Sequence, residues 1–527
     1  MSRFGAIAAA GMKPWPCLQL PALSRLPALS RLYVAQAAPI SLTMTSRQKI
    51  LAGLAVFIVL IAAFAWWATR GDTASVPFED VTGANPVLEE EYSAEQIPTV
   101  AVAESVGWAS GEAPETAEGL AVSRFAEGLD HPRTMLTLPN GDVVVAETRA
   151  PEGALPDGLV GKIMGYFMDK AGAGGPSPDK LILLRDSDGD GKADARFTLR
   201  EADLQSPSGL AYRDGRLLVA NHDAVIAFPF EPGQTAIETS PEKLLDLPPA
   251  GMHWMRNIAL SPDGEKLYIA IGSASNVGEN GMDLEQGRAS IKEYDFAKKS
   301  QRPYAQGLRN PNGMAWNPAT GELWTVVNER DMLGSDLVPD YLTNVPVGAQ
   351  YGWPWVFWRN NEDRRAKDPM PQFLTEYTRR PEYALGPHVA ALGLVFTGEG
   401  HMMGEKFANG AFIAQHGSWN RKPRSGYNVV FVQFDKLGNP LDKPVPVLEG
   451  FLTGDGETHG RPTWLTWAKD GALLVSDDTA GIIWRVVAPG AKPAPKPKAV
   501  KSEPLPPQRN LRPPRPEDVL GQDYIRY

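Results

Sequence analysis

Two histidines, His253 and His459, and several arginines recur at one kind of position in this 527-residue chain, a short polar stretch directly before a predicted apolar strand. Histidine can accept a proton near neutral pH, and arginine binds carboxylates through paired, charge-assisted hydrogen bonds. Several arginines in one pocket repel each other unless an anionic ligand lies between them, so we expect a small, multiply anionic ligand. The candidates are Gln205 in "LQSPSG", His253 in "HWMRN", Arg309 and Asn310 in "GLRNPNG", Arg461 in "HGRPTW" and Arg421 in "QHGSWNR", which follows its strand instead.

A second group of residues has the spacing of a metal-binding loop. "DSDGDGKAD" places carboxylates at loop positions 1, 3, 5 and 9 with glycine at position 6, as in an EF-hand calcium loop. Position 12 is Phe197, so the usual bidentate glutamate is missing. The loop predicts a structural Ca²⁺ on a peripheral hairpin, and a plain acidic turn is the alternative. The candidate ligands are Asp186, Asp188, Asp190 and Asp194.

A repeating element must bring the polar stretches together, because they lie far apart in the sequence. A turn followed by an apolar strand appears six times, and the N-G and D-G turns between apolar runs predict β-hairpins. One hairpin cannot bury both of its faces, whereas four-stranded blades in a ring can. The pattern therefore predicts an all-β fold, a six-bladed β-propeller, with the polar stretches at one end of its channel. The repeats are residues 131–147, 206–221, 255–272, 310–329, 391–417 and 461–478.

The chain ends are predicted to lie outside the propeller. Residues 50–68 form an uncharged apolar run long enough to cross a bilayer, preceded by Arg47 and Lys49 and followed by acidic residues. This predicts an inner-membrane anchor with the bulk of the chain in the periplasm, and a cleaved signal peptide is the alternative. The expected regions are a leader (1–46, with Met44 as an alternative start), the anchor (47–70), a linker (71–119), the propeller (120–487) and a disordered proline-rich tail (488–527).

Composition excludes several classes of protein. A formal net charge of −10 argues against nucleic-acid binding by the chain as a whole. The chain's one cysteine, Cys17, lies in the leader, so the remainder offers no disulfide, thiolate metal site, iron–sulfur cluster or covalent haem attachment. Any redox chemistry must therefore use a cofactor that is bound without a covalent link.

Four segments resemble the glucose/sorbosone dehydrogenase family, and in particular its membrane-associated sorbosone-type branch: "MHWMRNIALSPDG", "GLRNPNGMAW", "QYGWPWVFW" and "DDTAGIIWRV". The resemblance covers roughly residues 120–487. It implies a six-bladed propeller that uses pyrroloquinoline quinone (PQQ) and Ca²⁺ to oxidise a sugar or a sugar-derived aldehyde. Hydride would pass to the quinone, and the electrons would then pass to an external carrier such as a cytochrome or a membrane quinone.

The resemblance also implies roles for single residues. His253 matches the base, Arg309 the arginine that polarises the quinone carbonyl, and Gln205, Asn310, Arg421 and Arg461 match cofactor contacts. The carbonyls of Glu329 and Arg330, in "NERDM", stand where the family holds calcium with a Gly-Pro turn.

The sequence departs from the family at Ser273. The soluble glucose enzymes carry an acid there that supports the histidine, so Asn276 or Glu279 is expected to compensate, or the base is tuned differently.

Two other functions remain open from the sequence alone. A lactonase-type hydrolase would need calcium held by carboxylate side chains in the channel, and the pre-strand positions are basic instead. A non-catalytic binding propeller of the cell envelope is the other alternative. The sequence identifies neither the substrate nor the electron acceptor.

Overall fold

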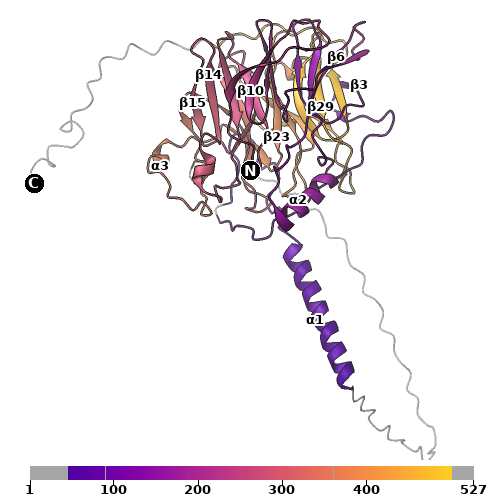
Figure 1. Cartoon of the computed structure of the whole chain (residues 1–527), viewed down its shortest axis with the longest axis vertical. Coiled ribbons are helices and arrows are strands. Elements are labelled where there is room, and N and C mark those ends of the chain that lie inside the picture. The colour runs from indigo at the N-terminus through magenta and orange to yellow at the C-terminus, as the bar shows by residue number, and fades with distance from the viewer. Residues whose placement is uncertain (1–44, 90, 360, 501–527) are drawn as a thin grey trace, which may run out of the picture. The chain divides into compact units, whose positions relative to one another are not determined.

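A ring of six β-sheets makes up most of the chain, which confirms the predicted propeller (Figure 1). The computed structural model describes residues 45–89, 91–359 and 361–500. The chain divides into two compact units, Met1–Phe64 and Ala65–Tyr527, and the ring belongs to the second. The innermost strands contact one another in chain order, and the last contacts the first, which closes the ring.

Each blade begins with one of the six predicted hairpins as its two innermost strands. Blade one consists of β4 (Pro132–Thr137), β5 (Val143–Glu147), β6 (Lys180–Arg185) and β7 (Ala195–Arg200). Blade two consists of β8 (Gly209–Arg213), β9 (Arg216–Ala220), β10 (Ala224–Pro229) and β11 (Glu242–Asp246). Blade three consists of β12 (Arg256–Leu260), β13 (Lys266–Ile271), β14 (Ser290–Asp295) and β15 (Ser300–Gln306), with β19 (Ala349–Gln350) added. Blade four consists of β16 (Asn310–Trp316), β17 (Leu323–Asn328), β18 (Pro339–Asn344) and β22 (Tyr383–Pro387). Blade five consists of β23 (Ala391–Phe396), β24 (Gly410–Gln415), β25 (Asn428–Gln433) and β26 (Val445–Glu449), with β2 (Glu115–Thr116) added. Blade six consists of β28 (Pro462–Trp467), β29 (Leu473–Asp477), β30 (Ile482–Val487) and β3 (Ala121–Ala126).

The hydrophobic core is divided into six layers, one between each pair of neighbouring blades. Alternate residues of a strand point to opposite faces of its sheet, so every blade feeds two layers. In β5, Val143 and Val145 enter the layer shared with blade six, while Val144 and Ala146 enter the layer shared with blade two. This explains why the strands read as continuous apolar runs.

Glycine in the innermost strands allows successive blades to approach closely. A Cβ added at Gly209 would lie 2.3 Å from the carbonyl oxygen of Arg256 on the next blade, and one at Gly313 would lie 2.4 Å from that of Leu392. The recurring "PSG" and "PNG" sequences at the start of these strands therefore serve the ring itself.

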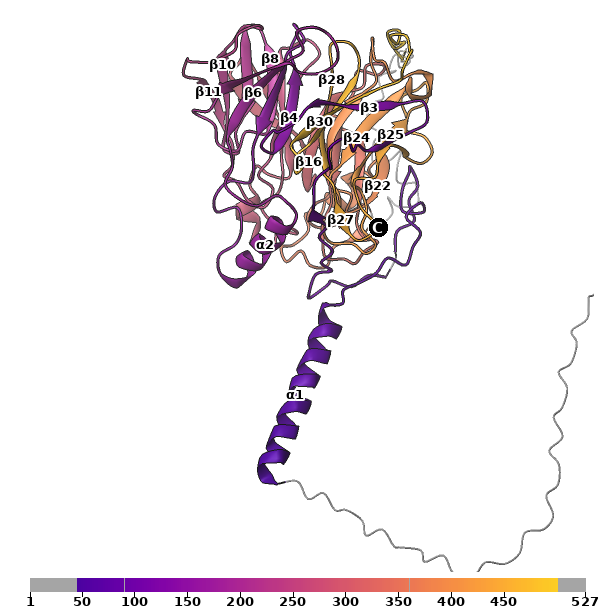
Figure 2. The ribbon, with the colours of Figure 1, turned by 90° about the vertical axis from the view of Figure 1, so that its right-hand side faces the viewer.

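The outermost strand of blade six comes from the opposite end of the propeller sequence. Strand β3 pairs antiparallel with β30, with Ala121 opposite Val487, and this pairing joins the two ends of the ring (Figure 2).

The segment 71–119, predicted as a linker, is tied to one end of the propeller over much of its length. We call residues 70–108 the strap. The Asp72 carboxylate accepts a hydrogen bond from the Ser335 N–H (2.7 Å), and the Asp336 carboxylate accepts one from the Val76 N–H (3.0 Å). Strand β1 (Glu104–Ser105) then pairs with β27 (Glu457–Thr458).

Helix α1 (Ser46–Thr69) contains the predicted anchor, and its window Ser46–Ala63 is exposed and apolar enough to cross a membrane. Two further helices, α2 (Gly158–Lys170) and α3 (Leu374–Tyr377), lie in loops, as do the short 3-10 turns Met282–Glu285 and Glu405–Phe407 and the pair β20 (Val356–Phe357) and β21 (Asn361–Glu362). The leader up to residue 44, with Cys17 and Met44, and the tail from residue 501 lie outside the described residues.

Candidate functional site

The candidate residues gather at one end of the channel, which we call the mouth. The first two strands of each blade are antiparallel, so the residue before the first strand lies beside the residue after the second. In blade three, for example, Arg256 at the start of β12 pairs with Ile271 at the end of β13. The mouth is therefore built from both kinds of segment, although the repeated pattern in the sequence pointed mainly to the first kind.

Arg256 fixes the loop that carries His253. Its guanidinium is buried and donates to the carbonyl oxygens of His253 (2.8 Å), Met255 (3.0 Å) and Pro248 (3.2 Å). The arginine of "HWMRN" is thus a structural clamp, and its histidine stands at the mouth.

Ser273 orients the imidazole of His253. Nδ1 of His253 lies 2.9 Å from the Ser273 carbonyl oxygen and 3.0 Å from its hydroxyl oxygen, while that hydroxyl donates to the Ser275 carbonyl. A carbonyl only accepts, so Nδ1 carries the proton and Nε2 keeps its lone pair. Burial and the nearby Arg309 lower the pKa of His253 to about 3, which keeps the ring neutral. Ser273 itself therefore orients the ring at the position where the acid is missing.

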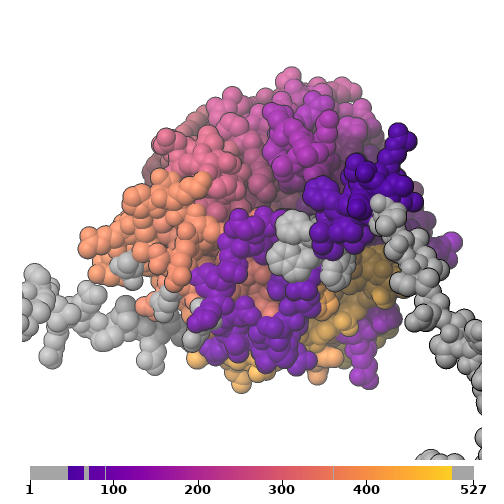
Figure 3. Space-filling view, turned by 90° about the horizontal axis from the view of Figure 1, so that it is seen from below, coloured from indigo at the N-terminus to yellow at the C-terminus, as the bar shows by residue number. Residues whose placement is uncertain are grey.

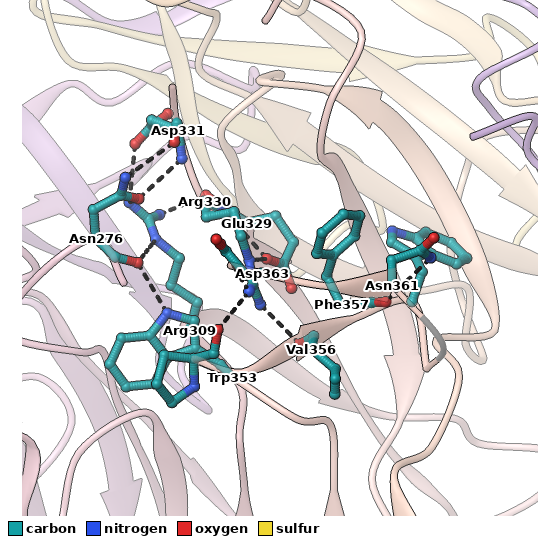
Figure 4. Close-up of polar contacts among 12 residues, drawn as sticks. Asn276, Arg309, Glu329, Arg330, Asp331, Trp353, Val356, Phe357, Asn361 and Asp363 are labelled. Atoms are coloured by element: carbon teal, nitrogen blue, oxygen red, sulfur yellow. Dashed lines mark hydrogen bonds and ion pairs between the residues drawn. The ribbon is translucent and has the colours of Figure 1, made fainter. Parts of the chain in front are cut away.

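Asn276 binds Arg309 and Asp331 together (Figure 4). Its side-chain oxygen accepts from Arg309 Nη2 (2.9 Å) and from the Asp331 N–H (3.0 Å), and its amide donates to the Asp331 carbonyl (3.0 Å). Its backbone carbonyl accepts from Arg309 Nε (3.2 Å) and from the indole of Trp353 (2.9 Å). Asn276 thereby fixes the guanidinium of Arg309, whereas Glu279 accepts from the N–H groups of Asn276 and Val277 in its own turn.

Asp331 lies between two cationic groups. Its carboxylate pairs with Arg309 at 2.9 Å and with Nδ1 of His388 at 3.4 Å. Although burial opposes the shift, Arg309 and His388 lower the pKa of Asp331 to about 2. Burial also disfavours the charged form of His388, but the hydrogen bond and charge of Asp331, together with Asp340, raise its pKa. We call His253, Ser273, Asn276, Arg309, Asp331 and His388 the first cluster.

Arg330 anchors the loop of the first cluster from behind. Its buried guanidinium donates to the carbonyls of Pro354 (2.8 Å) and Val356 (3.0 Å) and pairs with Glu329 (2.9 Å) and Asp363 (3.3 Å) (Figure 4). The Glu329 carbonyl, predicted as a calcium ligand, accepts a hydrogen bond from Arg309 at 2.5 Å.

A second cluster lies where blades five, six and one meet the mouth. It consists of His131, Arg133, His416, Arg461 and Asp478. The Asp478 carboxylate accepts from His416 Nε2 (2.9 Å), lies 3.4 Å from His131 Nε2 and pairs with Arg133. Burial and Arg461 lower the pKa of His416 to about 3, and burial lowers that of His131 to about 4. Against its own burial, the two imidazoles and Arg133 hold the pKa of Asp478 well below its usual range.

The two clusters are linked through the "HWMRN" loop. The guanidinium of Arg133 lies 5.7 Å from the ring of Trp254, and its Nε lies 3.3 Å from the sulfur of Met255. Arg461 donates to the carbonyls of His416 and Gly417, both at 2.9 Å. Among the described residues no carboxylate forms an ion pair with Arg461, so its charge is not neutralised locally.

The other predicted contacts differ in their distance from these clusters. Asn310 adjoins His253, since a Cβ on Gly272 would meet both Asn310 Oδ1 (2.4 Å) and His253 Cβ (2.5 Å). Gln205 is exposed at the end of blade two, where its N–H donates to Asn221. Arg421 turns toward the strap, with Asp336 at 3.4 Å and the Phe78 ring at 5.2 Å.

The acidic loop lies between β6 and β7, away from the mouth. Carboxylate oxygens of Asp186, Asp188 and Asp194 lie within 4.8 Å of one another. Asp190 is not part of this group, and its carboxylate accepts from the Lys192 N–H instead. Calcium binding by this loop stays a prediction.

Sequence reasoning missed two of the six residues of the first cluster and four of the five residues of the second. Asp331, His416 and Asp478 follow second strands, Arg133 lies within a first strand, and His388 lies in a connection between blades. Strand pairing could have found three of them, Asp331, His416 and Asp478, because the residue after a second strand lies beside the residue before the first. Asp477, for example, pairs with Pro462, so the next residue, Asp478, lies near Arg461.

Comparisons with known proteins agree on one family. The TrAA12-like family model matches residues 182–347 and 347–488, more than half of the chain. An uncharacterised protein of Borreliella burgdorferi is 29% identical over 297 residues, which cover 54% of this chain and 76% of that protein. The pyrroloquinoline quinone-dependent pyranose dehydrogenase of Coprinopsis cinerea is 25% identical over 340 residues, covering 53% of this chain and 46% of that enzyme, so the match spans about half of its length.

Two solved structures share the fold. The calcium structure of the Trichoderma reesei family AA12 enzyme has a TM-score of 0.57 at 19% identity, covering 71% of this chain and 97% of that one. The holo form of the pyranose dehydrogenase PQQ domain of Coprinopsis cinerea has a TM-score of 0.55 at 20% identity, covering 72% and 97%.

Proposed function

Because this chain belongs to the TrAA12-like family, we propose that it is a PQQ-dependent oxidoreductase acting on a sugar or a sugar-derived aldehyde. The proposal is supported by the PQQ dependence stated for the pyranose dehydrogenase of Coprinopsis cinerea, to which the chain is similar. The electrons leave through an external carrier, which we take to be a cytochrome or a membrane quinone.

The observation that carries the proposal is a neutral histidine beside a fixed arginine at the mouth. Nε2 of His253 keeps its lone pair because Nδ1 donates to Ser273, so His253 can accept the proton of a substrate hydroxyl. Arg309 is fixed by Asn276 and Asp331 and presents a positive charge to an oxygen that gains electron density. The bonds that fix both groups exist before any substrate arrives, so they need no rearrangement during the reaction.

The second cluster has the donor chemistry that a polycarboxylate such as PQQ needs. Arg133 and Arg461 bring two guanidinium groups to a region with a single ionised partner, Asp478. The buried Nδ1 of His131 and Nε2 of Gln415 have no hydrogen-bond partner among the residues that the structure describes. We propose that Arg461 and Arg133 hold cofactor carboxylates, with Asn310 contacting the cofactor beside His253. PQQ, when bound, would accept the two electrons released as the substrate CH–OH becomes C=O.

Ca²⁺ is part of the proposal because a family AA12 enzyme has a calcium structure. The Glu329 carbonyl does not fit a calcium ligand as it stands, since it already accepts from the positively charged Arg309. The Arg330 carbonyl stays a predicted calcium ligand, because the bonds of the Arg330 side chain to Pro354 and Asp363 do not involve it. We therefore assign Ca²⁺ no ligand at Glu329 and no step in the reaction.

We propose that α1 anchors the chain in the inner membrane, with the propeller in the periplasm. Its 18-residue window, Ser46–Ala63, contains no acidic residue, and the uncharged apolar run within it begins directly after Arg47 and Lys49. An uncleaved helix would keep the propeller at the membrane surface.

Reconstitution tests the function directly. The full chain, purified in detergent without cofactor, is mixed with PQQ and Ca²⁺, and a dye acceptor is followed during the addition of single aldoses and aldehydes. We expect the bound-quinone spectrum and substrate-dependent dye reduction, both requiring PQQ. Failure to bind PQQ would overturn the proposal, and binding without oxidation of any sugar or aldehyde would refute the substrate class.

A further inference from the structure

Helix α2 presents apolar residues to solvent in place of the usual polar face. Leu159, Ile163 and Tyr166 are spaced by four and three residues, so they share one side of the helix, and Val160 flanks them. All four are exposed, and Leu159 has 72% of its surface accessible. A helix on the surface of a water-soluble domain normally turns charged or polar residues outward, so this face lacks a partner.

The opposite side of α2 packs on the loop that leads into the helix. Gly161 is buried, and a Cβ there would lie 1.7 Å from the Pro156 carbonyl oxygen, so the helix packs closely on the loop that leads into it. At the other end Lys170 pairs with Glu104 of the strap at 3.4 Å. These contacts hold α2 at its start and at its end.

Helix α2 lies at the mouth end of the propeller. It connects β5 to β6, and β5 ends at the mouth, where Glu147 pairs with Pro132. Figure 3 shows the molecule from this end, and Figures 1 and 2 place α2 among the loops there. Two other exposed apolar residues, Met252 and Leu284, belong to segments that join strands at the same end.

The chain itself ties this end to the proposed anchor. Helix α1 ends at Thr69, and Asp72 is already bonded to Ser335 at the mouth. Three residues span at most roughly 11 Å when fully extended. If α1 crosses a bilayer, the mouth end of the propeller must therefore remain next to the surface of that bilayer.

We propose that α2 is an interfacial helix that lies in the membrane surface beside the anchor, with Leu159, Ile163 and Tyr166 between the headgroups and the acyl chains. The inference rests on the anchor proposed for α1. A helix of this kind buries its apolar side in the boundary region, and a lysine such as the exposed Lys162 is attracted to anionic lipids. With α1 it gives the propeller two attachment points, so the mouth faces the bilayer.

Site-directed labelling of the full chain tests this. In a Cys17→Ser background, single cysteines replace Leu159, Ile163 or Leu437 and carry an environment-sensitive fluorophore. Leu437 is the matched control, because it is 70% exposed, lies in the turn between β25 and β26 and is remote from the mouth. The proteins are reconstituted in phosphatidylcholine–phosphatidylglycerol vesicles that contain doxyl-labelled lipid.

We expect blue-shifted emission and several-fold stronger quenching at positions 159 and 163 than at 437. In the unlabelled protein, hydrogen exchange at residues 158–170 should be slower in vesicles. The 435–439 turn, which stays exposed to buffer, should show no such slowing. Equal quenching at all three positions overturns the proposal. The same result is expected if the natural partner of the α2 face is a protein, because lipid would then have no preference for that face.

Carbonate extraction of the same vesicles separates the two membrane claims. A chain that is extracted overturns the anchor and the interfacial helix together. A retained chain with unquenched labels overturns the interfacial helix alone. None of these measurements requires PQQ, so failure of the proposed oxidoreductase activity would leave their result unchanged.

Discussion

The two clusters at the mouth contain the same kinds of group, yet the pKa of His388 in the first is raised and that of His416 in the second is lowered to about 3. His388 and His416 each bond to an aspartate that also binds an arginine. Beside His388 a second carboxylate, Asp340, favours the proton, whereas beside His416 a second guanidinium, Arg461, opposes it. Burial disfavours the charged form of both histidines, and the charged neighbours reverse that effect at His388 and reinforce it at His416.

This difference suits two tasks. In the first cluster Asp331 pairs with both Arg309 and His388, and a second carboxylate, Asp340, lies near His388, so the cluster can hold a base and a positive charge at fixed positions. The second cluster has more positive than negative charge, because Arg133 and Arg461 face one ionised carboxylate. An imbalance of that kind is the expected state of an anion site before its ligand binds.

Removal of the carboxylate should damage the second cluster most. Asp478→Asn leaves Arg133 buried without its ionised partner, and we expect a loss of about 3–5 kcal/mol in the free energy of unfolding. Asp331→Asn should cost clearly less, because His388 can release its proton and Arg309 keeps the carbonyls of Glu329 and Asn276. Urea denaturation of both variants measures the difference, and equal losses would contradict the charge imbalance.

Removal of the proposed base should affect turnover alone. For His253→Ala we expect a fall in kcat of about 10²–10⁴-fold with PQQ binding retained, the range for a lost general base. His459→Ala is the control, since His459 also precedes a strand but stacks on Trp108, with ring centroids 4.7 Å apart. An unchanged kcat in His253→Ala would remove this residue from the mechanism.

Loss of one guanidinium should weaken the anion site without affecting the base. Arg461→Ala should raise the Kd for PQQ by about ten- to a hundredfold, the value of one hydrogen bond to a charged group. Arg302→Ala, on the outer edge of blade three and paired with Glu293, should leave the Kd unchanged. Titration of the quinone spectrum measures both, and equal affinities would place the cofactor carboxylates elsewhere.

The smallest effect concerns pH. The pKa of His388 is raised in the folded chain, so its contribution to stability is complete below about pH 6.5, the unfolded value, and is lost as pH rises through the folded value. The slope is at most about 1.4 kcal/mol per pH unit. Burial raises the pKa of Asp340 to about 7. The stability that Asp340 loses as pH rises is therefore lost mainly below pH 7.

Denaturation between pH 7 and 9 isolates the histidine. We expect wild type to lose stability over this range and His388→Gln to lose less. His416→Gln should follow the wild-type curve there, because the depressed pKa of His416 affects stability only as pH falls below about 6.5. Parallel curves for wild type and His388→Gln would mean that His388 is neutral.

The sequence predicted the ring well because each blade starts with a local signal. The turns near Gly141, Gly264 and Gly471 lie between apolar runs, and each became the hairpin of two inner strands. Such signals depend on a few adjacent residues, so no long-range information is needed to detect them.

The site was only half predictable for a geometric reason. Pre-strand residues such as His253 share a repeated context that stands out in the sequence. The residues opposite them, such as Asp331, belong to loops of different length, and only the strand pairing shows that they meet. Helix α2 was missed for another reason. Gly158, Gly161 and Gly165 lower its helix propensity, and its apolar residues do not stand out in a chain with many apolar strands.

The pairing of β3 with β30 also has a consequence for how the chain acquires its structure. Residues 121 and 487 are partners, so blade six remains incomplete until almost all of the chain has been synthesised. Contacts between such distant residues form slowly, because the loop that joins them must first be closed against its entropy. Until then β30 offers an unpaired edge, which is a hazard for aggregation. Ring closure is therefore expected to be the late, rate-limiting event of folding.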